Sequence, residues 1–255
     1  MGRQRRLDQK RGWAFATAVA IVKPTLVALT KQEWHDGLKI PATGGCVLAV
    51  NHLSHVDPLT FAHFVYDHGR IVRYLAKQEV FEMPLVGPIA TNAGQIPVAR
   101  LSADAGKSFE AAVEAIDAGQ AVAFYPEGTI TRDPGLWPMR GKTGAARVAL
   151  TTGCPVIPIG QWGVQDLLPP YGRPHIFPRK TIRVKAGDPV DLRDLLGRSQ
   201  TNEILHEATD RIMASITALV EDLRGEKAPA ERFDPLAAGV RPTGNPHQDE
   251  KQRRP

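Results

Sequence analysis

A chain of 255 residues with 42% hydrophobic and 23% charged residues is typical of one globular domain with short additional segments. The formal net charge is +5, and most of it comes from an N-terminal cluster that sets five basic residues against Asp8: Arg3, Arg5, Arg6, Lys10 and Arg11. Because the rest of the chain is nearly neutral, a nucleic-acid partner is not expected. The two cysteines lie in or beside apolar segments, which argues against a disulfide framework and favours a reducing cytoplasmic setting.

The first predicted element is an apolar helix over residues 13–30, WAFATAVAIVKPTLVALT. It is not typical of a signal peptide, because Lys23 and Pro24 interrupt the run and no small-residue cleavage site follows. It is also a weak membrane span. Eighteen residues reach only about 27 Å, short of the ~30 Å apolar core of a bilayer. A lysine near the middle costs roughly 2.5–3.5 kcal/mol on insertion scales, and an internal proline breaks or kinks a helix.

Bulky residues of this helix recur at alternating steps of four and three, which predicts a single apolar stripe: Phe15, Val19, Val22, Leu26 and Leu29. Such a stripe fits a helix that lies in the membrane interface with the basic cluster on anionic headgroups. A helix docked on its own domain is the alternative, and a spanning helix is a third. We therefore treat residues 1–35 as a membrane-associating N-terminal region.

The next segments alternate between strand and helix. An apolar strand is expected over 45–50, followed by a helix that begins with Asp57 as N-cap and Pro58 in its first turn and continues to about His68. A strand over 71–77 and an extended piece over 94–100 come next. Ser102 is expected to cap a helix that ends near Gly119.

The second half repeats this alternation. Further strands are expected over 121–126, 155–161 and 181–187, with helices over 144–152 and from Thr201 to about Arg224. Beyond residue 224, proline, glycine and charge dominate, which predicts a mostly disordered tail over 225–255. The pattern predicts one α/β domain over 36–224, with a largely parallel or mixed sheet flanked by helices.

Polar loops over 51–57, 95–100 and 126–142 each follow a strand-like segment, and we expect them to meet at one rim of the sheet. The first loop carries His52, His55 and Asp57. Its spacing does not fit a dinuclear metal site of the His-x-His-x-Asp-His type, and no cysteine pair assists. No Gly-x-Ser-x-Gly turn presents a nucleophile. The remaining functional reading is a histidine base, His52, oriented by Asp57 at Nδ1. Taken alone, a simple loop histidine beside a helix cap is the plainer alternative.

The other two loops add groups that suit a phosphorylated polyol. Arg100 follows a rigid Ile-Pro-Val segment that can present a guanidinium to a phosphate. Glu127 can accept hydrogen bonds from hydroxyl groups, and the Gly128-Thr129 backbone can approach a phosphate closely. Lys142, like Arg140, supplies a further cation near the end of the third loop.

Four strings in order resemble the blocks of the glycerolipid acyltransferase family, whose best-known members are the lysophosphatidate acyltransferases: NHLSHVDP, GQIPVAR, YPEGTITR and CPVIPIG. The residues that carry the resemblance are Asn51, His52, Ser54 and Asp57; Gly94, Ile96, Val98 and Arg100; Pro126, Glu127, Gly128 and Thr129; and Pro158. The resemblance covers residues 40 to 190. One departure is that the arginine of the third block arrives late, at Arg132, which leaves its role open.

The resemblance implies an acyltransferase that moves a fatty acyl chain from acyl-CoA or acyl carrier protein to a hydroxyl of lysophosphatidate, giving phosphatidate. It implies that His52 and Asp57 are catalytic, without a metal or other cofactor. It also implies that Arg100, Glu127, Gly128 and Thr129 bind the acceptor, and we expect Lys142 to add charge for its phosphate. We expect a peripheral or monotopic enzyme on the cytoplasmic face of the cell membrane. The alternatives are an acyltransferase for another acceptor, glycerol 3-phosphate or a glycolipid, and a non-catalytic lipid-binding module.

Overall fold

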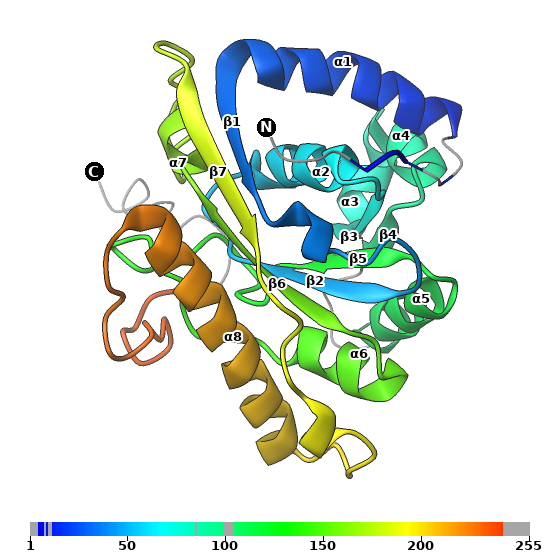
Figure 1. Cartoon of the computed structure of the whole chain (residues 1–255), viewed down its shortest axis with the longest axis vertical. Coiled ribbons are helices and arrows are strands. Elements are labelled where there is room, and N and C mark those ends of the chain that lie inside the picture. Colours follow the sequence, from blue (N-terminus) through cyan, green and yellow to red (C-terminus); the bar gives the residue numbers. More distant parts are fainter. Residues whose placement is uncertain (1–4, 8, 10–11, 85, 99–104, 242–255) are drawn as a thin grey trace, which may run out of the picture.

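The computed structural model of the chain describes residues 5–7, 9, 12–84, 86–98 and 105–241. Its centre is a seven-stranded sheet in the order β1-β7-β6-β2-β5-β3-β4 (Figure 1). The strands are β1 (Thr30–His35), β2 (Cys46–Val50), β3 (Val72–Lys77), β4 (Ile96–Val98), β5 (Ala121–Phe124), β6 (Val156–Trp162) and β7 (Lys180–Ala186).

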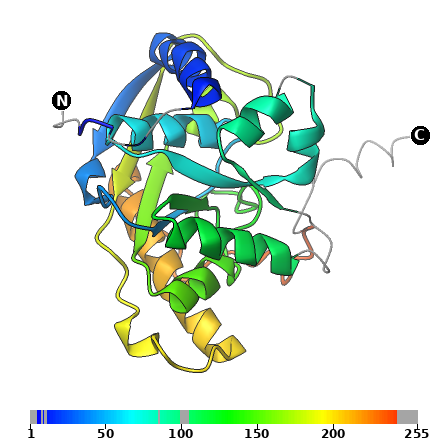
Figure 2. The same cartoon turned by 90° about the vertical axis from the view of Figure 1, so that its right-hand side faces the viewer.

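The α-helices are α1 (Trp13–Leu29), α2 (Asp57–Asp67), α3 (Gln78–Glu82), α4 (Val86–Asn92), α5 (Ala105–Asp117), α6 (Gly144–Thr152), α7 (Val164–Leu167) and α8 (Asn202–Arg224). Two short 3₁₀ turns, η1 (Gly37–Lys39) and η2 (Arg193–Leu195), complete the described elements. Helices α1 and α2 lie over one face of the sheet, whereas α5, α6 and α8 lie over the other (Figures 1 and 2).

The sheet is mixed. Strands β2, β3, β4, β5 and β6 run parallel to one another, β7 is antiparallel to β6, and β1 is parallel to β7. The carboxyl ends of the five parallel strands therefore meet at one edge, and the loops that follow them lie close together. The predicted single α/β domain with a mixed sheet and flanking helices is confirmed.

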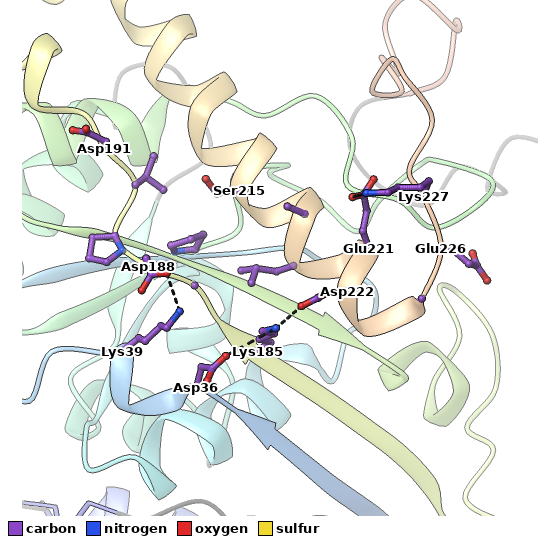
Figure 3. A pocket seen from close by; sticks show the side chains of 17 residues that line it. Asp36, Lys39, Lys185, Asp188, Asp191, Ser215, Glu221, Asp222, Glu226 and Lys227 are labelled. Carbon is purple, nitrogen blue, oxygen red and sulfur yellow. Dashed lines mark hydrogen bonds and ion pairs between the residues drawn. The ribbon is translucent and has the colours of Figure 1, made fainter.

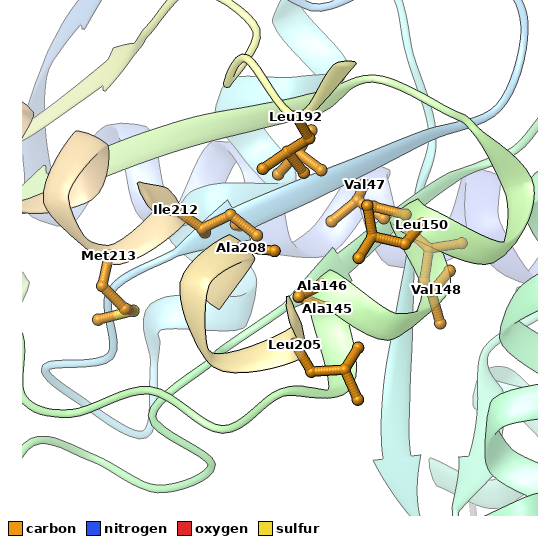
Figure 4. Packing of buried hydrophobic residues seen from close by; sticks show 14 of the residues in the cluster. Val47, Ala145, Ala146, Val148, Leu150, Leu192, Leu205, Ala208, Ile212 and Met213 are labelled. Atoms are coloured by element: carbon orange, nitrogen blue, oxygen red, sulfur yellow. The ribbon is translucent and has the colours of Figure 1, made fainter. Parts of the chain in front are cut away.

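Strand β2 is buried on both sides because each face of the sheet is covered by helices. Val47 and Ala49 pack with α5, α6 and α8, while Leu48 and Val50 pack with α2 on the opposite face. Figure 4 shows Val47 beside side chains of α6 and α8. This double burial explains why the strand reads as a continuous apolar run instead of alternating polar and apolar residues.

Most predicted elements lie where the sequence placed them. The helix over 144–152 has the predicted bounds, and Thr201 caps α8 by accepting a hydrogen bond from the N–H of Ile204. Ser102, the expected cap of α5, lies outside the described residues. The short elements β1, α3, α4 and α7 were not predicted, because they are brief or lack an apolar pattern.

The prediction of a disordered tail is wrong for residues 225–241, which fold back onto the domain. The N–H of Arg140 donates to the carbonyl of Phe233, and the Arg140 guanidinium pairs with Asp234 at 2.8 Å. Arg232 pairs with Asp210 on α8. The disorder was predicted because this segment contains few apolar residues to bury. Ion pairs and backbone hydrogen bonds fix it instead.

The apolar stripe of α1 faces the domain, so the structure corrects which side of the helix could meet a membrane and not the proposed membrane association itself. Phe15, Val19 and Val22 line a narrow apolar groove against α2, and Leu26 is buried. Lys23 forms an ion pair with Asp67 at the end of α2. The helix continues through Pro24, although a proline has no N–H to donate to the preceding turn.

The basic cluster is represented among the described residues by Arg5 and Arg6. Arg5 donates to the carbonyls of Ile40 and Leu38, so this guanidinium holds residues 5–7 on the domain. Arg3, Lys10 and Arg11 lie outside the described residues. In the part of the chain that the structure describes, no helix combines the length and the apolar character that crossing a bilayer demands.

Candidate active site

His52 and Asp57 form a hydrogen-bonded pair at the carboxyl end of β2. His52 Nδ1 lies 2.8 Å from Asp57 Oδ2, and the Asp57 side chain is completely buried while the His52 ring keeps partial exposure. The same carboxylate oxygen accepts the backbone N–H groups of Leu53 at 2.5 Å and Ser54 at 2.9 Å. Three donors therefore converge on one oxygen, and this arrangement fixes the orientation of the histidine ring.

The sequence predicted Asp57 as the N-cap of α2. In the structure Asp57 is instead the first residue of this helix. The capping position is Val56, and no side chain caps this helix. The Asp57 carboxylate instead turns back into the loop that precedes it. This position explains how a pair five residues apart can meet, because the loop between them wraps around the carboxylate.

The other ring nitrogen of His52, Nε2, has no hydrogen-bond partner within the described residues, so it is available to a substrate. The His52 ring stacks on Tyr125, with ring centroids 4.3 Å apart. His55 is exposed and packs edge-on against Tyr171, with ring centroids 5.6 Å apart. The two histidines thus have different surroundings, and only His52 is paired with Asp57.

Glu127 connects the loop after β5 to the main chain of His52. Its Oε1 accepts the His52 N–H at 2.8 Å, and its Oε2 accepts the Met139 N–H at 3.1 Å. The His52 carbonyl in turn accepts the N–H of Thr131. Both backbone groups of His52 are therefore held by the segment from 127 to 139. The sequence predicted that the Glu127 carboxylate contacts the acceptor directly. Because Glu127 is buried between these donors, it has no exposed surface for such a contact.

Burial also raises the pKa of Glu127 from 4.5 to about 8, although the hydrogen bonds from Met139 and His52 act in the opposite direction. Desolvation is the larger cause, because a carboxylate loses all of its hydration in this position. Neighbouring Asp57 adds a smaller repulsion that also raises the pKa.

Gly128, Thr129 and Lys142 lie together beside Glu127. Gly128 has a left-handed backbone with φ +72°, and a Cβ there would come within 2.7 Å of Lys142 Nζ. The Lys142 ammonium therefore lies directly over an exposed stretch of backbone. Lys142 is exposed and makes no ion pair with any other described residue. This exposed cation next to bare backbone suits an anionic group on a substrate.

The remaining predicted cations are placed differently. Arg100 lies outside the described residues. Arg140 is engaged with Asp234. Arg132, whose role the sequence left open, donates to the Tyr171 hydroxyl at 2.7 Å and lies over its ring. It therefore joins the loop after β5 to the loop after α7.

Two supports of the site were missed from sequence. Asn51 and Gln161 join the ends of β2 and β6 through three hydrogen bonds: Asn51 Nδ2 to the Gln161 carbonyl, the Gln161 N–H to Asn51 Oδ1, and Gln161 Nε2 to the Asn51 carbonyl. Asn51 stood in the first block, but nothing in the sequence paired it with Gln161, 110 residues away. Tyr125 was likewise indistinguishable from an ordinary strand-end aromatic residue.

Arg224, the last residue of α8, was also missed. Its guanidinium carbon lies 3.7 Å from the ring centroid of Trp137 and 4.2 Å from that of Trp162. It also donates to the Gly135 carbonyl at 2.8 Å. Because Trp137 precedes Met139 by two residues, Arg224 fixes the same segment that holds Glu127 and His52.

A cavity of about 850 Å³ lies elsewhere, between β7 and the C-terminal half of α8 (Figure 3). None of the predicted catalytic or acceptor-binding residues lines it, although Pro158 of the fourth block does. Its lining carries six acidic side chains and three lysines, with Lys39 paired to Asp188 and Lys185 paired to Asp222. Cavity size therefore does not locate the candidate active site, whereas the His52–Asp57 pair does.

Comparison with known proteins identifies the family of this chain. Residues 32–162, just over half of the chain, match the sequence model of the acyltransferase family. The chain belongs to the acyltransferase family. This range includes His52, Asp57 and the complete segment from Glu127 to Lys142, so the family resemblance inferred from the four blocks is confirmed.

Relatives and a solved structure are similar to this acyltransferase over much of its length. The chloroplastic 1-acyl-sn-glycerol-3-phosphate acyltransferase BAT2 of Brassica napus is 30% identical over 162 residues, which cover 62% of this chain and 45% of that protein. This chain therefore spans less than half of the plant protein's length. The 1-acyl-sn-glycerol-3-phosphate acyltransferase of Neisseria gonorrhoeae is 27% identical over 187 residues, 70% of each chain. The crystal structure of the 1-acyl-sn-glycerophosphate acyltransferase PlsC from Thermotoga maritima has the same fold, with a TM-score of 0.63 at 22% identity, covering 84% of this chain and 81% of that one.

Proposed function

We propose that this acyltransferase transfers a fatty acyl chain from an acyl thioester to a hydroxyl of lysophosphatidate, giving phosphatidate for phospholipid synthesis. The observation that carries the proposal is the buried His52–Asp57 pair with Nε2 directed away from the carboxylate. The named activity of the Brassica and Neisseria relatives supports this acceptor.

In the proposed mechanism, Asp57 holds the Nδ1–H of His52, so Nε2 is the basic nitrogen. Nε2 takes the proton of the acceptor hydroxyl as its oxygen attacks the thioester carbonyl carbon. The tetrahedral intermediate then collapses, the C–S bond breaks, and the imidazolium returns its proton to the departing thiolate. The products are an ester and a free thiol. Asp57 stabilises the imidazolium while it exists, and no metal or covalent acyl-enzyme is required.

The acceptor is held by groups that surround His52. We place its phosphate near Lys142 and the Gly128-Thr129 backbone, with Arg100 as a second cation of the same site. Glu127 contributes indirectly, because it fixes the His52 main chain instead of touching the glycerol. Positioning of this kind makes the attack effectively unimolecular, and such positioning contributes a large part of many catalytic rate enhancements.

We place the enzyme on the cytoplasmic face of the cell membrane, with α1 as a peripheral contact. The supporting observation is the outward side of α1, opposite the buried stripe, which exposes Trp13, Ile21 and Val27. No acidic residue lies between positions 9 and 32. An apolar and acid-free helix side suits a bilayer surface where the acceptor and product reside.

The test is release of free thiol from acyl-CoA or acyl carrier protein over a panel of acceptors, followed with a thiol reagent. We expect thiol release with lysophosphatidate and little with glycerol 3-phosphate or a glycolipid. A different preferred acceptor would replace the proposed one. Lipid binding without any thiol release would favour the non-catalytic alternative.

Two variants test the residue assignments. His52→Ala should lower kcat about 10²–10⁴-fold, the usual contribution of a general base, while the exposed His55→Ala serves as the matched control. Arg100→Ala should raise KM for the acceptor about ten- to a hundredfold, because charge-assisted hydrogen bonds contribute roughly 1.5–3 kcal/mol. A change in KM for the acyl donor alone would contradict the phosphate role of Arg100.

A further inference from the structure

The loop over 168–179, between α7 and β7, begins at the rim of the active site. Ser54 of the first block donates its hydroxyl to the Leu168 carbonyl at 2.7 Å. Tyr171 packs against His55 and accepts a hydrogen bond from Arg132. The base of this loop is therefore attached to the two loops that carry the catalytic pair and its supports.

The other end of the loop is attached to α1. Arg179 Nη2 donates to the carbonyls of Val27 and Thr30, both at 2.6 Å, and so caps the C-terminus of α1. Both views of the molecule place this loop and α1 at the same end (Figures 1 and 2). The loop thus links the active-site rim to the helix that we place at the membrane.

Two large apolar side chains stand exposed near the end of this loop. Phe177 is 77% exposed and Ile176 is 42% exposed. On α1, Ile21 is exposed to a similar degree, 63%. Adjacent exposed aromatic and aliphatic residues at a loop end are costly in water, because each leaves apolar area hydrated that burial would remove.

The charges around these residues are of one sign. Residues 167–187 contain no acidic side chain. The loop itself carries Arg173 and Arg179, and Lys180 follows it directly. Neither Arg173 nor Lys180 forms an ion pair with another residue in the part of the chain that the structure describes. A cationic rim around exposed apolar residues is complementary to anionic lipid headgroups above an apolar bilayer interior.

We propose that the 168–179 loop is a second membrane contact, which inserts Phe177 and Ile176 into an anionic bilayer beside the outward side of α1. This inference rests on the proposed membrane function of the enzyme. The two contacts hold the His55–Tyr171 rim next to the lipid surface. A lysophospholipid acceptor then passes from the bilayer to His52 along the loop, without crossing bulk water.

The experiment measures binding of the full-length protein to vesicles of phosphatidylcholine with and without phosphatidylglycerol, by cosedimentation. Phe177→Ala should weaken binding to the anionic vesicles about tenfold, because the contact scales with buried apolar area. Ile21→Ser tests α1 independently. Leu196→Ala, an exposed leucine of the η2–α8 connection at the opposite end of the molecule, is the matched control and should bind like the wild type.

A second measurement separates membrane contact from catalysis. Phe177→Ala should lower kcat/KM about tenfold for acceptor presented in vesicles and leave it unchanged for the same acceptor dispersed as monomers. Phe177 is mostly exposed, so its loss should not lower the thermal stability.

The outcomes distinguish the loop inference from the membrane association of the enzyme as a whole. If the wild type binds and Ile21→Ser weakens binding while Phe177→Ala does not, the loop inference is overturned and the membrane function of α1 stands. If the wild type binds neither kind of vesicle but still releases thiol, membrane association as a whole fails while the acyltransferase activity stands. Weaker binding of Arg173→Ala to anionic but not to zwitterionic vesicles would further support the loop inference, because only anionic headgroups attract the guanidinium of this loop.

Discussion

Replacing Asp57 by asparagine removes the negative charge of the side chain but keeps its shape. In Asp57, one oxygen accepts three hydrogen bonds, from His52 Nδ1 and from the N–H groups of Leu53 and Ser54, while Oδ1 has no partner among the described residues. An asparagine side chain in the same position should therefore place its single oxygen on the three donors and its NH₂ at the empty position. The opposite orientation would direct NH₂ against two backbone N–H groups.

This orientation keeps the Nδ1–H tautomer of the histidine, so the loss is the charge that stabilises the imidazolium. Hydrogen bonds to a charged group contribute roughly 1.5–3 kcal/mol, which predicts a fall in kcat of about 10²-fold for Asp57→Asn. The free energy of unfolding should change far less than for Asp57→Ala, which leaves two buried N–H groups unpaired at about 1–3 kcal/mol each. Thiol release gives kcat, and urea unfolding gives stability. A kcat within about threefold of the wild type would refute the reasoning, because the charge of Asp57 would then have no catalytic use.

Variants at three further positions test the supports of this pair and the proposed phosphate site. Because the pKa of Glu127 is raised to about 8 from 4.5, the folded protein retains a proton there that the unfolded chain has lost. The free energy of unfolding should therefore fall as pH rises from about 4.5 to 8, by about 1.4 kcal/mol per pH unit, and Glu127→Gln should flatten this dependence in urea titrations. Arg224→Leu should lower stability by about 1–3 kcal/mol and kcat severalfold, since two cation–π contacts and the anchor of the 133–139 segment are lost, whereas Arg224→Lys should recover part of both. Gly128→Ala should cost about 1–2 kcal/mol in backbone strain and raise KM for lysophosphatidate, because its Cβ displaces the Lys142 ammonium; an unchanged KM would argue against phosphate binding there.

The helices and strands that the sequence predicted are those whose pattern of apolar and polar residues matches the burial of their side chains in the folded domain. Strand β2 is apolar on both faces and buried on both, and α8 has a cap at Thr201 together with an amphipathic pattern. Strand β1 was missed because TKQEWH lies at the edge of the sheet, where alternate side chains meet water and polar residues are tolerated. The residues 225–241 were misjudged for a related reason. Their order depends on partners such as Asp210 and Arg140, far away in the sequence.

The candidate site divides in the same way. The pairing of His52 with Asp57 was predictable, because a short loop can bring together only residues that are close in sequence. The role of Glu127 was not, since its partners are backbone N–H groups, one of them 75 residues away, which no pattern of side-chain types encodes. The stripe of α1 was recognised correctly as an apolar face. Its partner was misassigned because a periodic stripe is the same whether a bilayer or a neighbouring helix covers it.

The hydrogen bonds of Glu127 explain why the third block of the family pattern lies next to the first in space. A general base has to be held in place, and His52 can be fixed at three points: its ring by Asp57, its N–H by Glu127 and its carbonyl by Thr131. The last two points belong to a loop that is itself held by Arg224 from the last helix of the domain. The position of the base thus depends on contacts that span the chain from β2 to the end of α8. A substitution at the end of α8 should therefore change turnover without touching the substrate, as the Arg224 variants are expected to demonstrate.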